Sequence, residues 1–175
     1  MLLAAQLPVD AATWPQRYGL TGGVTLSDAG GGSFVGPTVL AMTGPGSTLV
    51  RESFTVRGKQ LIAVTHPSCH FLANALSAIF SDAVLRGRLR GKMTLLTLQQ
   101  SEADLSDFKQ WSSAHPQDQF KMAFAMADWP MLTSWDTPIF YFLHDGVVVD
   151  QVHSWPRDSD NLVALRLALD RLERR

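Results

Sequence analysis

A single cysteine flanked by two histidines is the first feature of this chain that could carry out chemistry. His66, Cys69 and His70 stand within five residues of one another. Cys69 is expected in the first turn of a helix that begins near Ser68, where unpaired backbone N–H groups and the helix dipole stabilise a thiolate. Either histidine could stabilise that anion further, or act as a general acid or base.

The cysteine count limits the mechanisms that are open to the chain. One cysteine excludes an intramolecular disulfide, a four-thiolate zinc site and a two-cysteine redox cycle within one chain. His66, Cys69 and His70 could supply three ligands to zinc or copper. No second cluster of ligands supports such a site, so we expect no metal and no cofactor. The alternative to a reactive thiol is that Cys69 is a small, inert, buried hydrophobe.

The elements around this cluster follow from the spacing of apolar residues. Residues 61–65 form a short apolar run typical of a buried strand, and His66, Pro67 and Ser68 break it. Apolar residues then recur at intervals of three and four from Phe71 to Phe80, which predicts a helix with one apolar face. The cysteine is therefore expected between a strand and a helix.

The rest of the chain predicts further alternating elements. These are strands at 53–56 and 93–98, a helix from Leu105 to Trp111, a helical stretch at 120–127, a hairpin of strands 139–143 and 147–152, and a final helix capped by Asp158 or Ser159. From residue 61 onward the order is β-α-β-α-β-β-α. Right-handed crossovers make the first strands parallel, and the hairpin adds antiparallel ones. We therefore predict an α/β domain with a mixed sheet and helices on both of its faces.

The N-terminal part differs in composition from the rest. Nine of the thirteen glycines lie between Gly19 and Gly46, with short β-like pieces at 24–26 and 38–42 and a possible helix at 11–17. A separately folded unit of this size without a disulfide or a metal is not expected. We predict that residues 1–47 are an extension packed on a domain of residues 48–175.

Charge and hydropathy exclude several classes of function. Fifteen basic and sixteen acidic side chains leave a net charge of −1, so neither nucleic acid nor an anionic membrane is an expected partner. No apolar run approaches the roughly 20 residues of a membrane helix. The first residues lack the positive charge of a signal peptide. The cytoplasm and, for a mature exported domain, the periplasm both stay open, and the oligomeric state is not predicted.

Two segments resemble the thioredoxin superfamily. Gly58–Phe71 resembles the strand, active-site turn and helix start of that family, and Trp135–Val147 is similar to its cis-proline and terminal hairpin. The likeness covers roughly residues 50–173 and leaves the glycine-rich part outside it. It implies a thioredoxin-like fold, a mixed sheet flanked by helices, here with a glycine-rich N-terminal extension of strands and loops.

The active-site motif departs from the Cys-x-x-Cys of that family. The matching residues are His66, Pro67, Ser68 and Cys69, so only the second cysteine position is kept. Thr65 stands where a tryptophan is common, and the preceding strand contains no acidic residue. An alternative register, with a shortened turn, places Cys69 at the reactive position. In either register we expect Cys69 to be the reactive group with His66 and His70 as its catalytic partners; the alternative for His66 is that it only caps or hydrogen-bonds the turn.

Substrate contacts are implied by the second segment. The resemblance predicts a cis bond before Pro138 and places Thr137, Pro138 and Trp135 against the substrate. Trp129, Trp135 and Trp155 are expected in the core rather than in a peptide groove.

Two functions from different classes therefore remain. The first is a monothiol protein acting in thiol–disulfide or peroxide chemistry through Cys69, with protein or small-molecule thiols and disulfides as partners and an external thiol such as glutathione to resolve the product. The second is a redox-inactive thioredoxin fold that binds peptides or serves as a scaffold.

Overall fold

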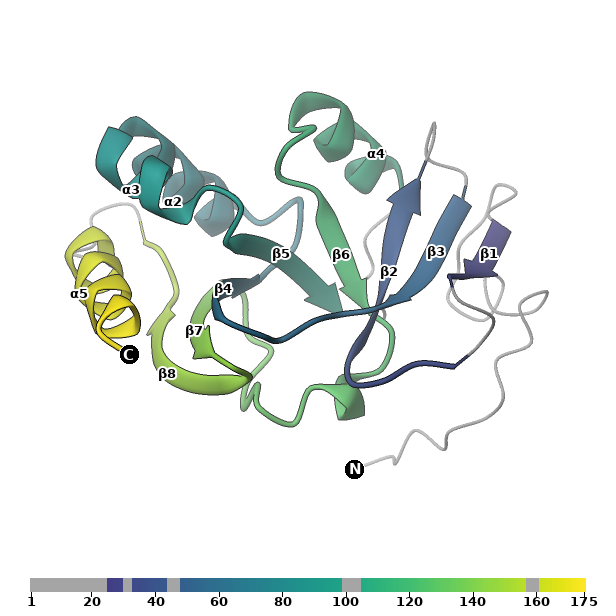
Figure 1. Cartoon of the computed structure of the whole chain (residues 1–175). Helices are drawn as coiled ribbons and strands as arrows, with labels where there is room; N and C mark the ends of the chain where they lie inside the picture. The colour runs from purple at the N-terminus through teal and green to yellow at the C-terminus, as the bar shows by residue number, and fades with distance from the viewer. Residues whose placement is uncertain (1–24, 30–32, 44–47, 99–104, 157–160) are drawn as a thin grey trace.

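Eight strands form one mixed sheet in the part of the chain that the computed structural model describes, which is residues 25–29, 33–43, 48–98, 105–156 and 161–175 (Figure 1). The strand order is β1-β3-β2-β6-β5-β4-β7-β8. The strands are β1 (Thr25–Asp28), β2 (Thr38–Thr43), β3 (Thr48–Ser53), β4 (Lys59–Val64), β5 (Met93–Leu98), β6 (Phe120–Ala123), β7 (Ile139–His144) and β8 (Val147–His153). The helices are α2 (His70–Ser81), α3 (Ala83–Leu89), α4 (Leu105–Ala114) and α5 (Asn161–Glu173), with a short 3₁₀ helix η1 (Met126–Asp128).

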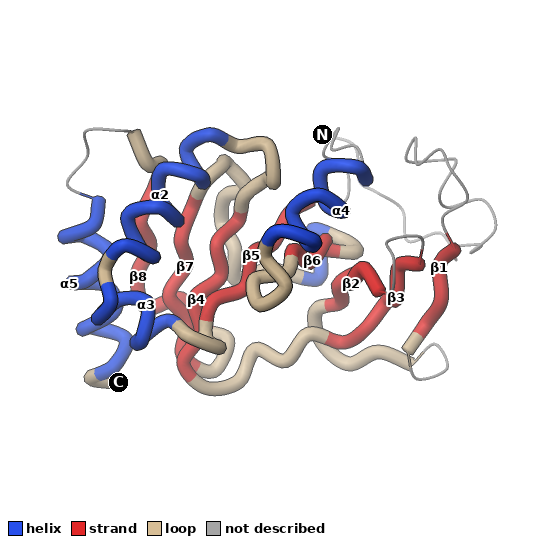
Figure 2. Tube along the Cα trace, turned by 90° about the horizontal axis from the view of Figure 1, so that it is seen from above, coloured by secondary structure: helices blue, strands red, loops and turns tan. Residues whose placement is uncertain are grey.

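Three adjacent parallel strands determine where the helices lie. β4 pairs with β5, and β5 pairs with β6, both in parallel. The first crossover contains α2 and α3, and the second contains α4. Both crossovers move in the same direction across the sheet, so right-handed connections place them on the same face. Figures 1 and 2 show α2, α3 and α4 together on one side of the strands.

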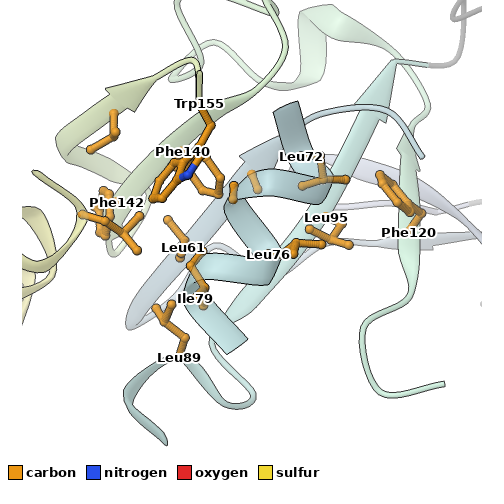
Figure 3. Packing of buried hydrophobic residues seen from close by; sticks show 14 of the residues in the cluster. Leu61, Leu72, Leu76, Ile79, Leu89, Leu95, Phe120, Phe140, Phe142 and Trp155 are labelled. Atoms are coloured by element: carbon orange, nitrogen blue, oxygen red, sulfur yellow. The ribbon is translucent and has the colours of Figure 1, made fainter. Parts of the chain in front are cut away.

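The two faces of the sheet are consequently buried by different parts of the chain. Leu61 and Ala63 of β4 belong to a cluster that contains every buried residue of the described helices, which we call the helix-covered face (Figure 3). Ile62 and Val64 belong to a second cluster with no helical residue, the loop-covered face. The mixed sheet with flanking helices is confirmed. The prediction of helices on both faces was wrong for the described helices: α2, α3 and α4 share one face because their crossovers continue in one direction, and α5 packs into the same cluster.

The loop-covered face is closed by the segment between β6 and β7. Trp129 is 1% exposed, and its ring centroid lies 5.1 Å from that of Phe54. The Tyr141 hydroxyl donates to the carbonyl of Ser134 at 2.7 Å and accepts from its N–H at 2.8 Å. A tyrosine of the sheet therefore supplies the hydrogen bonds that this irregular segment cannot form with itself.

Three elements differ from the sequence-based expectation. The stretch 120–127 was expected to be helical, but Phe120–Ala123 is β6, paired with β5 on one side and β2 on the other. A strand was expected at 53–56, but β3 ends at Ser53 and residues 54–56 are not in a strand. Helix α3 was not predicted; Asp82 caps it by accepting from the N–H groups of Val84 and Leu85 at 2.9 and 3.0 Å.

The hairpin of β7 and β8 forms as its sequence predicts. Its turn residues Asp145 and Gly146 have φ values of 50° and 78°, a left-handed conformation that aspartate tolerates and glycine favours. The Asp145 carboxylate also accepts from the N–H of Gly58 at 2.7 Å, which ties the turn to the start of β4.

The described part of the N-terminal segment continues the sheet. β2 pairs antiparallel with both β3 and β6, and β1 pairs parallel with β3. The guanidinium of Arg51 lies 3.6 Å from the Phe124 ring centroid and 4.3 Å from that of Phe34, which holds β3 against residues of the domain. The possible helix at 11–17 and the predicted caps of α5, Asp158 and Ser159, lie outside the described residues, and a boundary at residue 47 stays a prediction.

Candidate functional site

Two segments that are far apart in the sequence meet at one edge of the sheet. The parallel strands β4, β5 and β6 all end at this edge, and the antiparallel β7 begins there because Val64 pairs with Ile139. The turn after β4 therefore lies next to the residues that precede β7. The Thr65 and Thr137 hydroxyl oxygens are 3.3 Å apart, which joins the two segments directly.

Cys69 is the N-cap residue of α2, one position earlier than expected. Its N–H donates to the carbonyl of His66 at 3.0 Å, and its own carbonyl accepts from Ala73 at 3.2 Å. The thiol is partly buried against the helix-covered face and does not cap the helix. The sulfur is thus anchored at the start of a 12-residue helix, where the first backbone N–H groups have no partner within the helix.

His66 directs its imidazole to the turn itself. Nδ1 accepts from the N–H of Ser68 at 3.2 Å and lies 2.7 Å from the Ser68 hydroxyl oxygen. Because a backbone N–H can only donate, the neutral ring carries its proton on Nε2. The ring also meets Phe108 of α4 edge-on, with centroids 6.2 Å apart. Burial lowers the pKa of His66 from its ordinary 6.5, and the negative charge of Asp107 partly opposes this.

His70 points elsewhere. It is exposed on the first turn of α2, and its ring lies 3.9 Å from the ring of Phe71. Among the hydrogen bonds of the described residues, none joins the Cys69 sulfur to His66 or His70. The structure therefore brings the three residues into one turn without a direct thiol–imidazole hydrogen bond.

The residues expected to contact substrate have different surroundings. The Thr137–Pro138 peptide bond is cis, Thr137 is exposed and Pro138 is buried. The Pro138 carbonyl accepts from the N–H of Ser154 at 2.8 Å. Trp135 is half-buried and packs on the loop-covered face. Of Trp135, Thr137 and Pro138, only Thr137 is thus exposed at this edge.

The other two tryptophans lie in the core, as expected. Trp129 is 1% and Trp155 4% exposed, on the loop-covered and helix-covered faces respectively. Their burial is consistent with packing roles.

Two residues at the site were not identified from sequence. Ser68 provides the partners of the His66 imidazole, and Asp107 brings a carboxylate near it from α4. The His66–Pro67–Ser68 spacing could have indicated the first, because side chains in turns often accept from the N–H two residues later. The second depends on the packing of α4 over the turn, which no local pattern indicates.

Neither a metal cluster nor a membrane-spanning helix is found in the described part of the chain. Across residues 25–29, 33–43, 48–98, 105–156 and 161–175, no group of three or more His, Cys, Asp or Glu side chains could hold a metal ion. In the same residues, no helix is long and apolar enough to cross a membrane.

The arrangement of these segments identifies the fold. A strand, a turn with Cys69 and helix α2 lie beside a cis-proline that opens a terminal hairpin followed by a helix, and both resembling segments meet at one edge. The chain has a thioredoxin-like fold. Beyond β6, the strands β2, β3 and β1 extend its sheet, which has eight strands in the described part of the chain.

Comparisons with known proteins found similarity to solved structures only. No family model and no curated protein matches the sequence. Three solved structures of similar fold are a candidate thioredoxin from Neisseria meningitidis (14% identity, TM-score 0.45, covering 77% of this chain and 89% of that one), a candidate electron transfer protein from Aquifex aeolicus (11%, 0.48, 79% and 90%) and copper-bound ScoI from Arabidopsis thaliana (9%, 0.42, 80% and 98%). Identities this low concern the fold alone.

Proposed function

We propose that this chain is a monothiol protein that reacts with disulfides through Cys69. The observation that carries the proposal is the position of the thiol, which is partly exposed at the N-cap of α2, in the turn beside Thr137 and Pro138. A helix start favours the thiolate form, which is the nucleophile in disulfide exchange. Thr137, on the adjoining segment, is exposed.

The proposed reaction has two exchange steps. The Cys69 thiolate attacks one sulfur of a disulfide, a mixed disulfide forms, and the other sulfur leaves as a thiolate. An external thiolate, from glutathione or a partner cysteine, then attacks the substrate sulfur of the mixed disulfide and releases Cys69. One substrate sulfur is released as a thiol and the other leaves in a disulfide with the external thiol, so the net reaction is a thiol–disulfide exchange for which one cysteine is enough; a second external thiol would complete reduction of the substrate.

The remaining predicted residues have distinct proposed roles. Thr137, Pro138 and Trp135 contact the substrate chain, and His70, exposed on the first helical turn, protonates the departing thiolate. A peroxide is the alternative electrophile. In that case Cys69 takes one oxygen to form a sulfenic acid, an alcohol or water leaves, and two external thiols return the sulfur to the thiol with loss of water.

The test compares the same thiol in the folded and the unfolded chain. We expect oxidised glutathione to form a one-to-one adduct that is absent from Cys69→Ser, as seen by intact mass spectrometry. The observed rate at neutral pH, measured by stopped flow, should exceed that of the urea-unfolded chain by about threefold or more, because a larger fraction of the thiol is ionised. A folded rate equal to or below the unfolded rate would contradict the proposal.

The second candidate is a redox-inactive peptide-binding module. It is favoured by the packing of Cys69 against the helix-covered face, without a hydrogen bond to either imidazole. In this case Cys69→Ser binds an extended peptide as tightly as the native chain does, and folded Cys69 reacts more slowly than the unfolded thiol. Titration calorimetry with an extended peptide and the stopped-flow measurement together separate the two candidates.

A further inference from the structure

His66 closes the turn that carries Cys69 with both its backbone and its side chain. Its carbonyl accepts from the N–H of Cys69 at 3.0 Å, and Nδ1 accepts from the N–H of Ser68 at 3.2 Å. The Ser68 hydroxyl lies 2.7 Å from the same nitrogen and donates to it, because the lone pair of Nδ1 already serves as an acceptor. The His66 imidazole therefore binds both the N–H and the hydroxyl of Ser68, the residue directly before Cys69.

The geometry is that of a familiar turn made with an unusual side chain. In an Asx turn, an oxygen bonded to Cγ of Asn or Asp accepts from the N–H two residues later. In His66 the nitrogen bonded to Cγ does the same for Ser68. Asparagine can thus replace the acceptor without being able to transfer a proton near neutral pH, and this makes it a sharp probe of what His66 does.

The surroundings of the ring favour its neutral form. Phe108 of α4 meets it edge-on, and the charged group that acts on it is Asp107, also of α4. The titratable residues next to it in the chain are Cys69, the N-cap of α2, and His70, its first residue. The pKa of His66 is lowered mainly by burial, as expected for a ring that must stay unprotonated to accept.

We infer that His66 is a positioning residue, whose neutral imidazole holds the turn so that Cys69 stays at the N-cap of α2, and that it is not the proton donor or acceptor of the thiol. The inference rests on the proposed function only in the first test below, which measures disulfide exchange by Cys69. Protonation at Nδ1 removes the acceptor of the Ser68 N–H, so the turn loses this hydrogen bond, while the Ser68 hydroxyl can accept from the protonated nitrogen; we expect the turn to loosen as the pH falls below the ordinary range of histidine.

The first test compares His66→Asn with His66→Ala. The asparagine variant keeps the acceptor, so we expect its exchange rate per Cys69 thiolate to stay within about twofold of the native rate at neutral pH. The alanine variant loses the acceptor, and its rate should fall about fivefold, the effect of one lost hydrogen bond. If proton transfer by His66 mattered, the two variants would be equally slow, and this result would overturn the inference.

The second test does not depend on reactivity. Nitrogen-15 spectra of the native chain should show His66 as the Nε2–H tautomer, with the amide signal of Ser68 shifting at the same midpoint as the His66 ring. In His66→Asn the Ser68 amide should lose that titration between about pH 7.5 and pH 5. A native Ser68 amide that is insensitive to the His66 titration, or an Nδ1–H tautomer, would overturn the inference.

Together the two tests separate failure of the inference from failure of the proposed function. If Cys69 exchanges with no disulfide in any variant, the proposed function fails, while the tautomer and the Ser68 amide still decide the role of His66. Thermal unfolding of each variant shows whether it is folded at the temperature of the measurements. An alanine variant that does not fold leaves the decision to the native spectra and to His66→Asn.

Discussion

The two faces of the sheet are sealed by different means, and they should respond differently to mutation. On the helix-covered face, the helices satisfy their own backbone hydrogen bonds, so their contribution to stability comes from packing of apolar side chains. On the loop-covered face, the irregular segment before β7 needs partners for its backbone, and Tyr141 provides them to Ser134. On the helix-covered face, stability should therefore depend most on the volume of the buried side chains. On the loop-covered face, it should depend most on the polar groups that bind the backbone.

The largest effect is expected from Phe140→Ala on the helix-covered face. Phe140 is fully buried, and its ring meets that of Trp155 edge-on at 5.4 Å (Figure 3). We expect the free energy of unfolding to fall by about 3–5 kcal/mol, through lost burial and the cavity that remains. Urea unfolding followed by tryptophan fluorescence measures it. Phe140→Leu, which keeps most of the volume, should cost clearly less, and equal losses would break the comparison.

The loop-covered face is tested by Tyr141→Phe, which keeps the ring and removes one oxygen. The N–H and the carbonyl of Ser134 both lose a partner, so we expect a loss of about 1–3 kcal/mol in the free energy of unfolding. Ser134→Ala is the comparison variant, because it keeps the two backbone bonds to Tyr141 and removes only the exposed hydrogen bonds of its hydroxyl with Asp136, at 2.7 and 3.2 Å, so it should cost less than Tyr141→Phe. A neutral Tyr141→Phe would show that water can replace the hydroxyl.

A smaller effect is expected from protonation of His66, beside Phe108 of the helix-covered face. Burial holds the pKa of His66 in the folded chain below its ordinary 6.5. Between the folded pKa and 6.5, the unfolded chain therefore binds more protons than the folded chain. The contribution of the neutral ring is present above pH 6.5 and is lost as the pH falls toward the folded pKa. Urea midpoints measured across this range should fall toward acid, and His66→Asn should remove that part of the slope.

The smallest effect is expected at the exposed rim, from Glu173→Gln. A hydrogen bond from Arg88 is the main reason that the pKa of Glu173 lies below its ordinary 4.5. The stabilisation is therefore present above that pH and is lost as the pH falls through the lower, folded pKa. Since the Glu173 side chain is exposed and its charge is screened by solvent, we expect a change of about 0.2–1 kcal/mol at neutral pH that shrinks in high salt. A loss as large as that of Phe140→Ala would contradict the ranking.

The sequence by itself determined the local elements that carry the site. The apolar period of three and four fixed α2, the short apolar run fixed β4, and the Asp145–Gly146 pair fixed the hairpin of β7 and β8. Each of these depends on residues that are close in the chain, so their patterns were sufficient. The resemblance of two segments added the thioredoxin-like fold, because it linked elements that the patterns alone leave unconnected.

Only the tertiary structure decided the secondary structure of residues 120–123 and the face of the sheet that the helices cover. Four residues are too few to distinguish a period of two from one of 3.6, and Phe120–Ala123 is a strand because β5 and β2 pair with it from both sides. That strand continues the direction of the crossovers, and the direction puts α2, α3 and α4 on one face. The same packing brings α4 over His66, whose neutral, accepting imidazole depends on burial that no local pattern of residues can specify.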